Sequence, residues 1–311
     1  MSKSFIRSSS IVAVMTFLSR ILGLIRDFII ARYFGANGLT DAFLVAFRIP
    51  NFFRRLFAEG AFSQAFLPIL ANVKANENEE EVQLVINHIA TKLLSVLMVI
   101  TLISIILAPL IIFLFAWGFY FNSDMVQFNL ASDMLRITFP YLLLISLTAL
   151  SGAILNTYDN FTVPAFTPVL LNISLILSAI YLSKFLSTPI MALAWGVLIG
   201  GITQLLFQIP FLRKLKKLPK IQFGSHKAIS LLKKRMIPAL FGVSVSQINL
   251  LVDTMIASTL MVGSVSWLYY SDRLLELPLA LIGIALATVA MAKLSNYHAQ
   301  KDTKNFISTI N

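Results

Sequence analysis

Nine charged side chains lie in the otherwise apolar stretch from Ser19 to Gln64, and arginine outnumbers acid two to one. The arginines are Arg20, Arg26, Arg32, Arg48, Arg54 and Arg55, and the acids are Asp27, Asp41 and Glu59. A guanidinium presents a planar fork of N–H donors that binds two oxygens of a phosphate or carboxylate at once, and it stays protonated in apolar surroundings. The excess of arginine therefore favours a site for an external anion.

Helical spacing would place these charges in stripes. Arg20 and Asp27 are seven residues apart, which is two helical turns, so they share one face, with Arg26 beside them. Asp41, Arg48 and Arg55 repeat the same interval further along the chain and form a second stripe. As an alternative, opposite charges pair and merely hold helices together, while the outer arginines reach an interface with their long side chains. That alternative explains some of the charges but not the excess of arginine.

A second group of charges, Asp272, Arg273 and Glu276, lies towards the other end of the chain. Asp272 and Glu276 are four residues apart, on one helical face. Together with Asp253 the acids outnumber arginine here, so this region can absorb part of the excess. What remains indicates a substrate that carries phosphate or carboxylate on a lipophilic or large body.

The composition places these charges in a membrane. The chain is 58% hydrophobic and only 13% charged, whereas a soluble domain has about 25% charged residues. Its net charge of +11 could suggest a nucleic-acid partner, but the basic residues cluster in candidate cytoplasmic loops, as the positive-inside rule predicts. We therefore predict an all-α integral membrane protein that binds no nucleic acid.

The sequence gives no support to an enzyme. It contains no phosphate-binding glycine loop, no nucleophile elbow and no HExxH pattern. Its three histidines are scattered without the spacing of metal ligands, and cysteine is absent. We predict neither catalysis nor a cofactor or metal.

Eight windows are apolar over the roughly 20 residues that a bilayer crossing needs. Seven of them cover about Ser10–Phe34, Thr40–Leu70, Val82–Trp117, Phe128–Leu155, Pro189–Leu212, Met236–Val262 and Ser264–Asn296. The remaining one, the fifth in chain order, follows Pro164 and Pro168 and ends near Leu186.

Local signals refine these windows. Thr40 is the expected N-cap of the second helix, and Pro50 should kink or break that helix because proline removes a backbone hydrogen bond. Pro140 should interrupt the fourth window. The polar run Lys74–Glu81 predicts a loop with solvated glutamates.

The basic residues predict the orientation. Lys3 and Arg7 place the N-terminus in the cytoplasm, and the first helix is expected to be retained rather than cleaved as a signal peptide. Six crossings return Arg213–Arg235, which holds nine Lys or Arg and no acid, to the same side. The predicted parts are a six-helix lobe (1–212), a basic linker (213–235), two further helices (236–296) and a polar tail (297–311). The family resemblance described below implies the cytoplasmic (inner) membrane of a bacterium.

An internal repeat links the two ends of the chain. The segment from Ser19 to Ala31 aligns with the segment from Ser246 to Ala257 with one gap, which matches Asp27 to Asp253. Both copies start on the cytoplasmic side, so the repeat is parallel, as in transporters whose substrate site lies between two halves. The alternative is chance similarity between apolar helices.

Several runs of the sequence are distinctive, among them SRILGLIRDFIIARYFGA, TDAFLVAFRIPNFFRRLFAEGAFSQAFLPIL and GSVSWLYYSDRLLELP. These runs resemble a known family, the MurJ (MviN) lipid II flippases of bacteria, and the similarity extends from Ser8 to about Ser295. The resemblance implies a fold of the multidrug/oligosaccharidyl-lipid/polysaccharide exporter superfamily, in which two six-helix lobes enclose a cationic cavity. It also implies transport of lipid II, an undecaprenyl-diphosphate-linked disaccharide-pentapeptide, from the cytoplasmic to the periplasmic leaflet by alternating access.

The resemblance also assigns roles to residues. The family's cavity arginines correspond to Arg20, Arg26, Arg54 and Arg273, and Arg48 stands where some relatives have lysine. The charge partners and gating residues expected beside them are Asp27, Asp41, Asp272, Glu276, Ser19 and Asn51.

This chain departs from the family in length, because relatives continue for about six further helices. We therefore expect a complete first lobe with two helices of the second. Three alternatives stay open: a flippase half that needs a second polypeptide or a second copy of itself, a non-transporting remnant that at most binds lipid or a partner, and an exporter of another anionic lipid-linked cargo. The expected partners are lipid II or a similar polyprenyl-diphosphate lipid and the bilayer itself.

Overall fold

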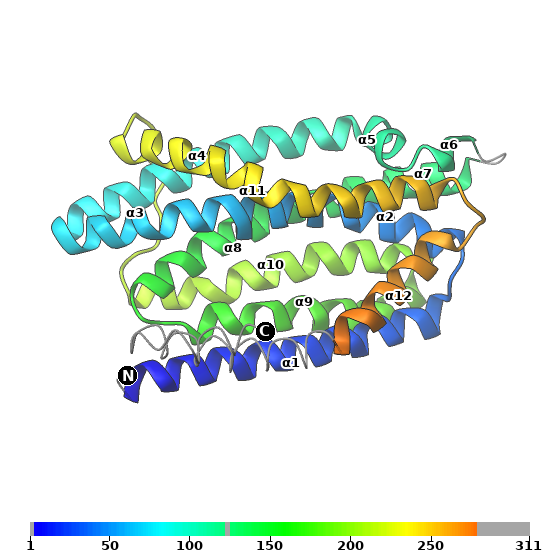
Figure 1. Ribbon diagram of the computed structural model, residues 1–311, viewed down its shortest axis with the longest axis horizontal. Helices are drawn as coiled ribbons and strands as arrows, with labels where there is room; N and C mark the ends of the chain where they lie inside the picture. The colour runs from blue at the N-terminus through cyan, green and yellow to red at the C-terminus, as the bar shows by residue number, and fades with distance from the viewer. Residues whose placement is uncertain (1–2, 122–124, 279–311) are drawn as a thin grey trace, which may run out of the picture. The chain divides into compact units, whose positions relative to one another are not determined.

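The computed structural model describes residues 3–121 and 125–278, without the side chains of 3–10, 57–59, 245–246 and 276–278, and the described part is helical (Figure 1). The elements are α1 Lys3–Phe34, α2 Gly38–Phe53, the π-helix η1 Arg54–Phe62, α3 Ser63–Asn76, α4 Glu79–Ile106, α5 Ala108–Phe115, α6 Gly118–Phe121, α7 Val126–Thr138, α8 Pro140–Thr157, α9 Thr162–Ile180, the 3-10 turn η2 Leu182–Phe185, α10 Met191–Lys214, α11 Lys227–Ser258 and α12 Ser264–Pro278. The chain divides into two compact units, 1–266 and 267–311.

Most of the predicted windows are long apolar helices. Five continuous stretches in the described part are long and apolar enough to cross a bilayer, and α11, bent by 47° between Ser244 and Gln247, makes a sixth. The 32 residues of α1 extend about 48 Å at 1.5 Å per residue. The last predicted helix is described as far as Pro278, and the rest of it lies outside the described residues. The predicted all-α membrane fold with about eight spanning helices is confirmed as a class.

The second window is one unbroken span built from α2, η1 and α3. Its N-cap is Asn37, whose Oδ1 accepts the backbone N–H groups of Leu39 at 3.0 Å and Thr40 at 3.1 Å, so the prediction of Thr40 as the cap is wrong. Pro50 does not break the helix; four residues later the backbone widens into the π-helix η1. π-Helical segments are rare and often mark functional positions.

The prolines in the third, fourth and fifth predicted helices affect those helices in different ways. The third window is divided at Leu107, two residues before Pro109, into α4 and α5. Pro140 begins α8 while α7 and α8 still form one span. The fifth helix begins at Thr162 and ends at Ile180 rather than near Leu186. It includes Pro164 because proline is tolerated in a first helical turn, and it continues through Pro168 in its interior.

The predicted glutamate loop is largely helical. Only Glu77 and Asn78 separate α3 from α4, and the Oδ1 of Asn78 accepts the N–H of Glu81 at 2.8 Å. Acids in this first turn of α4 are favourable because the N-terminus of a helix is partially positive. Glu79 also accepts a hydrogen bond from the hydroxyl of Tyr158 at 2.9 Å. Burial, and then this bond to Glu79, raise the pKa of the Tyr158 phenol, so it remains a donor.

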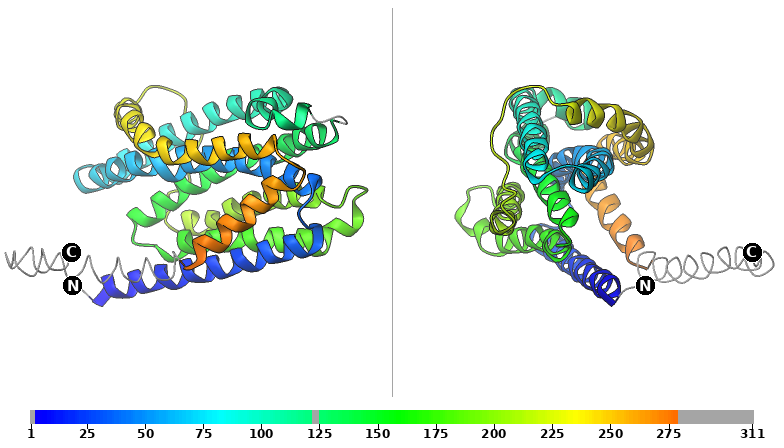
Figure 2. Two further views of the ribbon diagram at one scale, coloured as in Figure 1. Left: turned by 45° about the vertical axis from the view of Figure 1, so that its right-hand side comes forward. Right: turned by 90° about the vertical axis from the view of Figure 1, so that its left-hand side faces the viewer.

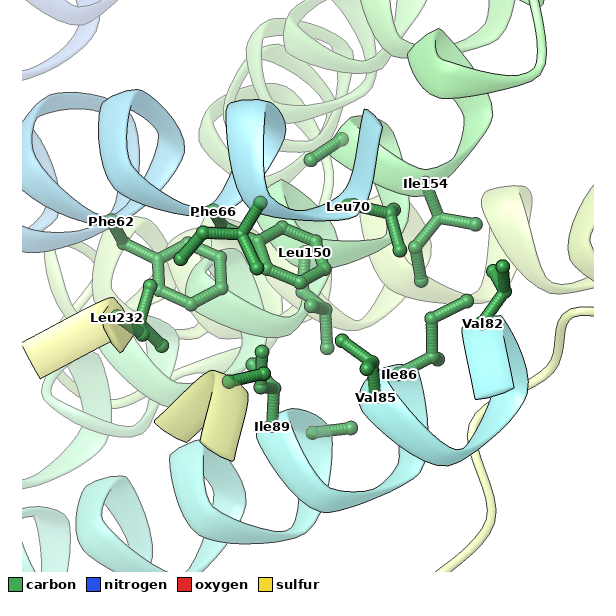
Figure 3. Packing of buried hydrophobic residues seen from close by; sticks show 14 of the residues in the cluster. Phe62, Phe66, Leu70, Val82, Val85, Ile86, Ile89, Leu150, Ile154 and Leu232 are labelled. Carbon is green, nitrogen blue, oxygen red and sulfur yellow. The ribbon is translucent and has the colours of Figure 1, made fainter. Parts of the chain in front are cut away.

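The seventh helix begins nine residues earlier than predicted, at Lys227 instead of Met236. Ala228 and Leu232, four residues apart, face the interior, while Lys227 before them and Lys233 and Lys234 after them are exposed. Figure 3 shows Leu232 in a cluster with Phe62, Phe66 and side chains of α4 and α8. This amphipathic pattern explains why a run of basic residues continues as helix rather than as loop.

The helices of the first unit run roughly side by side, and α1 packs along α9 at one edge (Figures 1 and 2). α9 in turn packs against α10, and α2 packs against α7. At the opposite edge α11 lies against η1 and α3. Charges on α1 and on α2 therefore face different neighbours.

We predict that the contact of α6 with α11 tolerates no side chain at Gly118. A Cβ there would lie 2.0 Å from the carbonyl oxygen of Ser258 and 2.5 Å from the N of Thr259. Gly118→Ala should lower the free energy of unfolding by about 1–3 kcal/mol, as overpacking does, measured as thermal stability in detergent. Gly242→Ala is the matched control, since nothing lies within 4 Å of a Cβ at Gly242. Equal stability of the two variants would contradict this contact.

Candidate functional site

A polar junction joins the middle of α1 to α9. Arg26 and Asp27 are both buried, with 7% and 5% of their surfaces exposed. The guanidinium of Arg26 donates to Oδ1 of Asp27 from Nε at 2.8 Å and from Nη2 at 2.6 Å, and its Nη1 donates to Oδ1 of Asn172 at 3.0 Å. The Nδ2 of Asn172 donates to the carbonyl oxygen of Ser19 at 3.0 Å. One amide thus connects two turns of α1 to α9.

This junction follows from the apolar surroundings. A charge at the centre of a spanning helix costs about 2.5–3.5 kcal/mol on insertion scales unless it finds polar partners. Arg26 has a carboxylate next to it in sequence and an amide on the neighbouring helix, so both its charge and its donors are engaged. Of the predicted group of Arg20, Arg26 and Asp27, the structure joins Arg26 and Asp27. It adds Asn172, which the sequence argument missed and which also binds the backbone of Ser19.

Arg20 is arranged differently. It shares the helical face of Asp27 by spacing, yet its side chain is exposed. Within the described part of the chain it makes no hydrogen bond or ion pair. Arg20 is therefore an accessible guanidinium in the middle third of the 32-residue helix α1, which is not among the six stretches found to be long and apolar enough to cross a bilayer.

The second stripe, on α2, contacts α11 and the first turn of α12. Asp41 is 2% exposed, and its carboxylate accepts the N–H of Gly263 at 2.7 Å, the N–H of Ser266 at 2.8 Å and the hydroxyl of Ser266 at 2.5 Å. Free N–H groups at a helix N-terminus form a natural site for an anion. Asp41 therefore caps a helix that begins 223 residues later in the sequence.

Arg48 lies two turns further along α2 and donates from Nη1 to Oγ1 of Thr254 on α11 at 2.5 Å. Asp41 and Arg48 thus hold α2 against one continuous stretch, the end of α11 and the turn into α12. The seven-residue spacing predicted a shared face, and the structure confirms that both residues contact the same neighbour. It does not place them with the junction on α1.

The remaining predicted residues have separate surroundings. Arg54 donates from Nε to Oδ1 of Asn51 at 2.7 Å, a bond within one helical turn. In the second unit the guanidinium carbon of Arg273 lies 5.2 Å from the centroid of the Tyr269 ring, a cation–π arrangement. Asp272 is half-buried beside it, and the side chain of Glu276 lies outside the described residues. Among the described residues no group of three or more His, Cys, Asp or Glu side chains is placed to hold a metal ion.

Three functional partners were missed by the sequence argument: Asn172, Thr254 and Ser266. Each is a small polar residue in an apolar helix or at a helix start. A weak signal did exist, because Asn172 is the one amide in the apolar run of α9, and an amide in a spanning helix needs a partner.

We predict that Asn172→Leu weakens the attachment of α1. The substitution leaves a donor of the buried Arg26 without its acceptor on α9, which typically costs about 1–3 kcal/mol. Thermal unfolding in detergent measures the loss. Asn172→Asp keeps an acceptor for Arg26 and should fall between the parent and Asn172→Leu. If Asn172→Leu is as stable as the parent, the amide does not carry this contact.

We also predict that Asp41→Ala frees the turn before α12. The chain has no cysteine, so a single spin label at Val262→Cys reports on that turn alone. The label should become more mobile in Asp41→Ala, because the N–H groups of Gly263 and Ser266 lose their acceptor. Asp133→Ala, in an exposed pair with Arg136, is the control and should leave the spectrum unchanged. An identical spectrum in Asp41→Ala would contradict the capping role.

Several known proteins are similar to this chain in sequence. The sequence profile described as "Lipid II flippase MurJ" matches residues 30–311. A relative from Haemophilus influenzae, named "Probable lipid II flippase MurJ", is 47% identical over 93% of this chain and 58% of its own length. "Lipid II flippase MurJ" from Burkholderia cenocepacia is 45% identical over 95% of this chain and 58% of its own length.

A solved structure agrees with the sequence relatives. "Lipid II flippase MurJ, inward closed conformation" superposes with a TM-score of 0.76 at 32% identity, and the match covers 96% of this chain and 60% of that one. The chain thus spans a little under three fifths of the length of the two curated relatives. On the profile match and these identities, the chain belongs to the MurJ family of lipid II flippases.

Proposed function

We propose that this chain supplies the first lobe, and the beginning of the second, of a lipid II flippase. In this proposal the substrate is an undecaprenyl-diphosphate-linked disaccharide-pentapeptide, which moves from the cytoplasmic to the periplasmic leaflet by alternating access and is then used in cell-wall synthesis. The family membership supports the proposal. A transporter of this kind carries out no covalent chemistry.

The accessible guanidinium of Arg20 is the observation that carries the proposal. Arg26 is engaged by Asp27 and Asn172, whereas Arg20 is exposed and has no partner among the described residues. In a membrane such a charge is stabilised by an oxyanion, and the arginine fork fits two oxygens of a diphosphate. Arg20 would hold the headgroup phosphate, while the junction of Arg26 and Asp27 keeps the helix beneath it in place.

The contacts of α2 supply a candidate gate. Alternating access requires that contacts between the two lobes form in one state and break in the other. The bonds of Asp41 to Gly263 and Ser266, and of Arg48 to Thr254, join a helix of the first lobe to the two helices that open the second. We propose that they close one end of the pathway and part when the lobes separate.

The membrane and the orientation belong to the same proposal. The N-terminus, the basic segment after α10 and the start of α11 would face the cytoplasm, because basic segments are retained there. The proposed membrane is the bacterial inner membrane, and the division into a first lobe, a basic linker and a second-lobe segment follows the spans. Whether a second polypeptide supplies further helices is decided by the experiment below.

We predict that Arg20 is needed for transport beyond its effect on stability. The chain is expressed in a strain depleted of its own flippase, alone and together with the part of the Haemophilus influenzae relative that lies beyond the match. Growth and delivery of lipid II to the outer leaflet are measured. Arg20→Ala should abolish rescue at unchanged membrane abundance, because the diphosphate loses its bidentate partner, and Arg20→Lys should rescue in part.

Arg213→Ala is the control, since Arg213 is an exposed arginine at the end of α10, outside the candidate site. It should rescue as well as the parent. Full rescue by Arg20→Ala would remove Arg20 from the substrate site. Failure of the parent chain in both arms would contradict the flippase proposal for this polypeptide. Delivery of a lipid with another anionic headgroup to the outer leaflet, in place of lipid II, would favour the other anionic cargo.

A further inference from the structure

The loop from residue 215 to residue 226, which joins α10 to α11, is fastened along α4, and we name it the strap. Gln83 donates from Nε2 to the carbonyl oxygen of Leu218 at 3.1 Å. Asn87 accepts the N–H of Lys220 at 2.9 Å and donates to Oε1 of Gln222 at 3.0 Å. The chain can be followed across the end of the bundle in Figures 1 and 2. A loop held at successive turns of a helix has a fixed surface.

Both ends of the strap are also fixed by charged groups. At its start the ammonium of Lys217 lies 2.5 Å from Oε2 of Glu79 and donates to the carbonyl oxygen of the same residue at 3.0 Å. At its end Nε2 of His226 lies 3.0 Å from Oε1 of Glu81, while Nδ1 of His226 caps α11 by accepting the N–H of Ala228 at 3.1 Å. The strap is therefore an ordered element of the first unit.

Its outward face is apolar. The backbone N–H of Gln222 donates to Oγ1 of Thr91 at 2.8 Å, so Gln222 points towards α4. In an extended chain neighbouring side chains alternate, and Ile221 and Phe223 accordingly point away, with 70% and 79% of their surfaces exposed. Within the described part of the chain, these two large apolar side chains are therefore left largely uncovered on a fixed loop.

The level of these side chains along α4 indicates what covers them. Among the hydrogen bonds between α4 and the strap, the bond to Thr91 lies furthest along α4, and Lys92 beside it is exposed. Beyond this point the exposed side chains of α4 are apolar; they are Val96, Met98, Val99, Ile100, Leu102, Ile103 and Ile106. Ile221 and Phe223 therefore lie where a spanning helix changes from a polar to a lipid-facing surface, at the depth of the lipid headgroups.

The basic residues around the strap favour an anionic lipid. Residues 213–235 contain nine Lys or Arg and no acid. Lys220 and Lys227, which flank the two apolar side chains, are both exposed. Basic residues around apolar side chains are typical of segments that lie in the interface of an anionic membrane.

We propose that the strap is an interfacial anchor for anionic phospholipid. Ile221 and Phe223 insert into the headgroup region of the leaflet at this end of the bundle, and Lys220 and Lys227 bind phospholipid phosphates around them. Because the strap connects α10 to α11, the anchor fixes the depth of the segment between the two lobes. This inference is independent of the transported substrate.

The depth of the strap in the bilayer is tested with single spin labels. The chain has no cysteine of its own, so one introduced cysteine carries the only label. Labels are placed at Phe223→Cys and, as a matched control, at Glu80→Cys, an exposed position at the start of α4. The protein is reconstituted in phosphatidylcholine alone or mixed with phosphatidylglycerol. With phosphatidylglycerol present, the label at 223 should be more accessible to oxygen than to a water-soluble nickel chelate, and the label at 80 should show the reverse. A label at 223 that behaves like the label at 80 in both lipids overturns the proposal.

Lipid preference is tested on the unlabelled protein. Binding of phosphatidylglycerol over phosphatidylcholine is measured for the parent, for Lys220→Gln with Lys227→Gln, and for Lys184→Gln as a control at the opposite end of the spans. The double variant should lose preference by roughly fivefold per lysine, the value expected for a basic residue at an anionic surface. An unchanged preference in the double variant overturns the assignment of the lysines. Displacement of lipid by inorganic phosphate would identify a site for free phosphate and overturn the anchor.

Discussion

The structure depends on one constraint, which is that a charge carried into a bilayer must meet polar groups from another part of the chain. Arg26 illustrates it, since its guanidinium is bound by Asp27 and by the amide of Asn172 on α9. Asp41 satisfies the same constraint with the free N–H groups at the start of α12. These contacts decide which helices are neighbours, because apolar surfaces alone do not distinguish one lipid-facing helix from another.

The same constraint distinguishes charged side chains that hold helices together from one that is exposed. Arg26, Asp27, Asp41 and Arg48 are engaged in contacts between helices. Arg20 lies on α1 close to the first junction and has no partner among the described residues. In the proposed transport of an anionic lipid, the contacts between helices would hold or release the lobes, and Arg20 would donate to the cargo.

The fold class and most spans could be predicted because hydropathy over 20 residues averages out local errors. Positions set by single hydrogen bonds could not be predicted. Thr40 and Asn37 are both good caps by type, and geometry decides for Asn37. The glutamates before α4 look solvated in sequence, yet Glu79 and Glu81 hold the strap through Lys217 and His226, 138 and 145 residues away.

The candidate site was predicted in the same partial way. Seven-residue spacing correctly placed Asp41 and Arg48 on one face, because a helix fixes that relation locally. It could not identify Asn172, Thr254 or Ser266, whose roles depend on which helices pack together. The residues of the second unit, with Arg273 against Tyr269, remain predicted members of the site.

The central claim is that α1 presents a guanidinium to the diphosphate of a lipid. Equilibrium binding of lipid II to the purified chain in lipid nanodiscs tests it directly, with inorganic diphosphate as competitor. The account predicts binding that diphosphate displaces and that Arg20→Ala weakens by about tenfold or more, the loss expected for a charged hydrogen-bonded pair. Binding that is unchanged by Arg20→Ala and insensitive to diphosphate would contradict it.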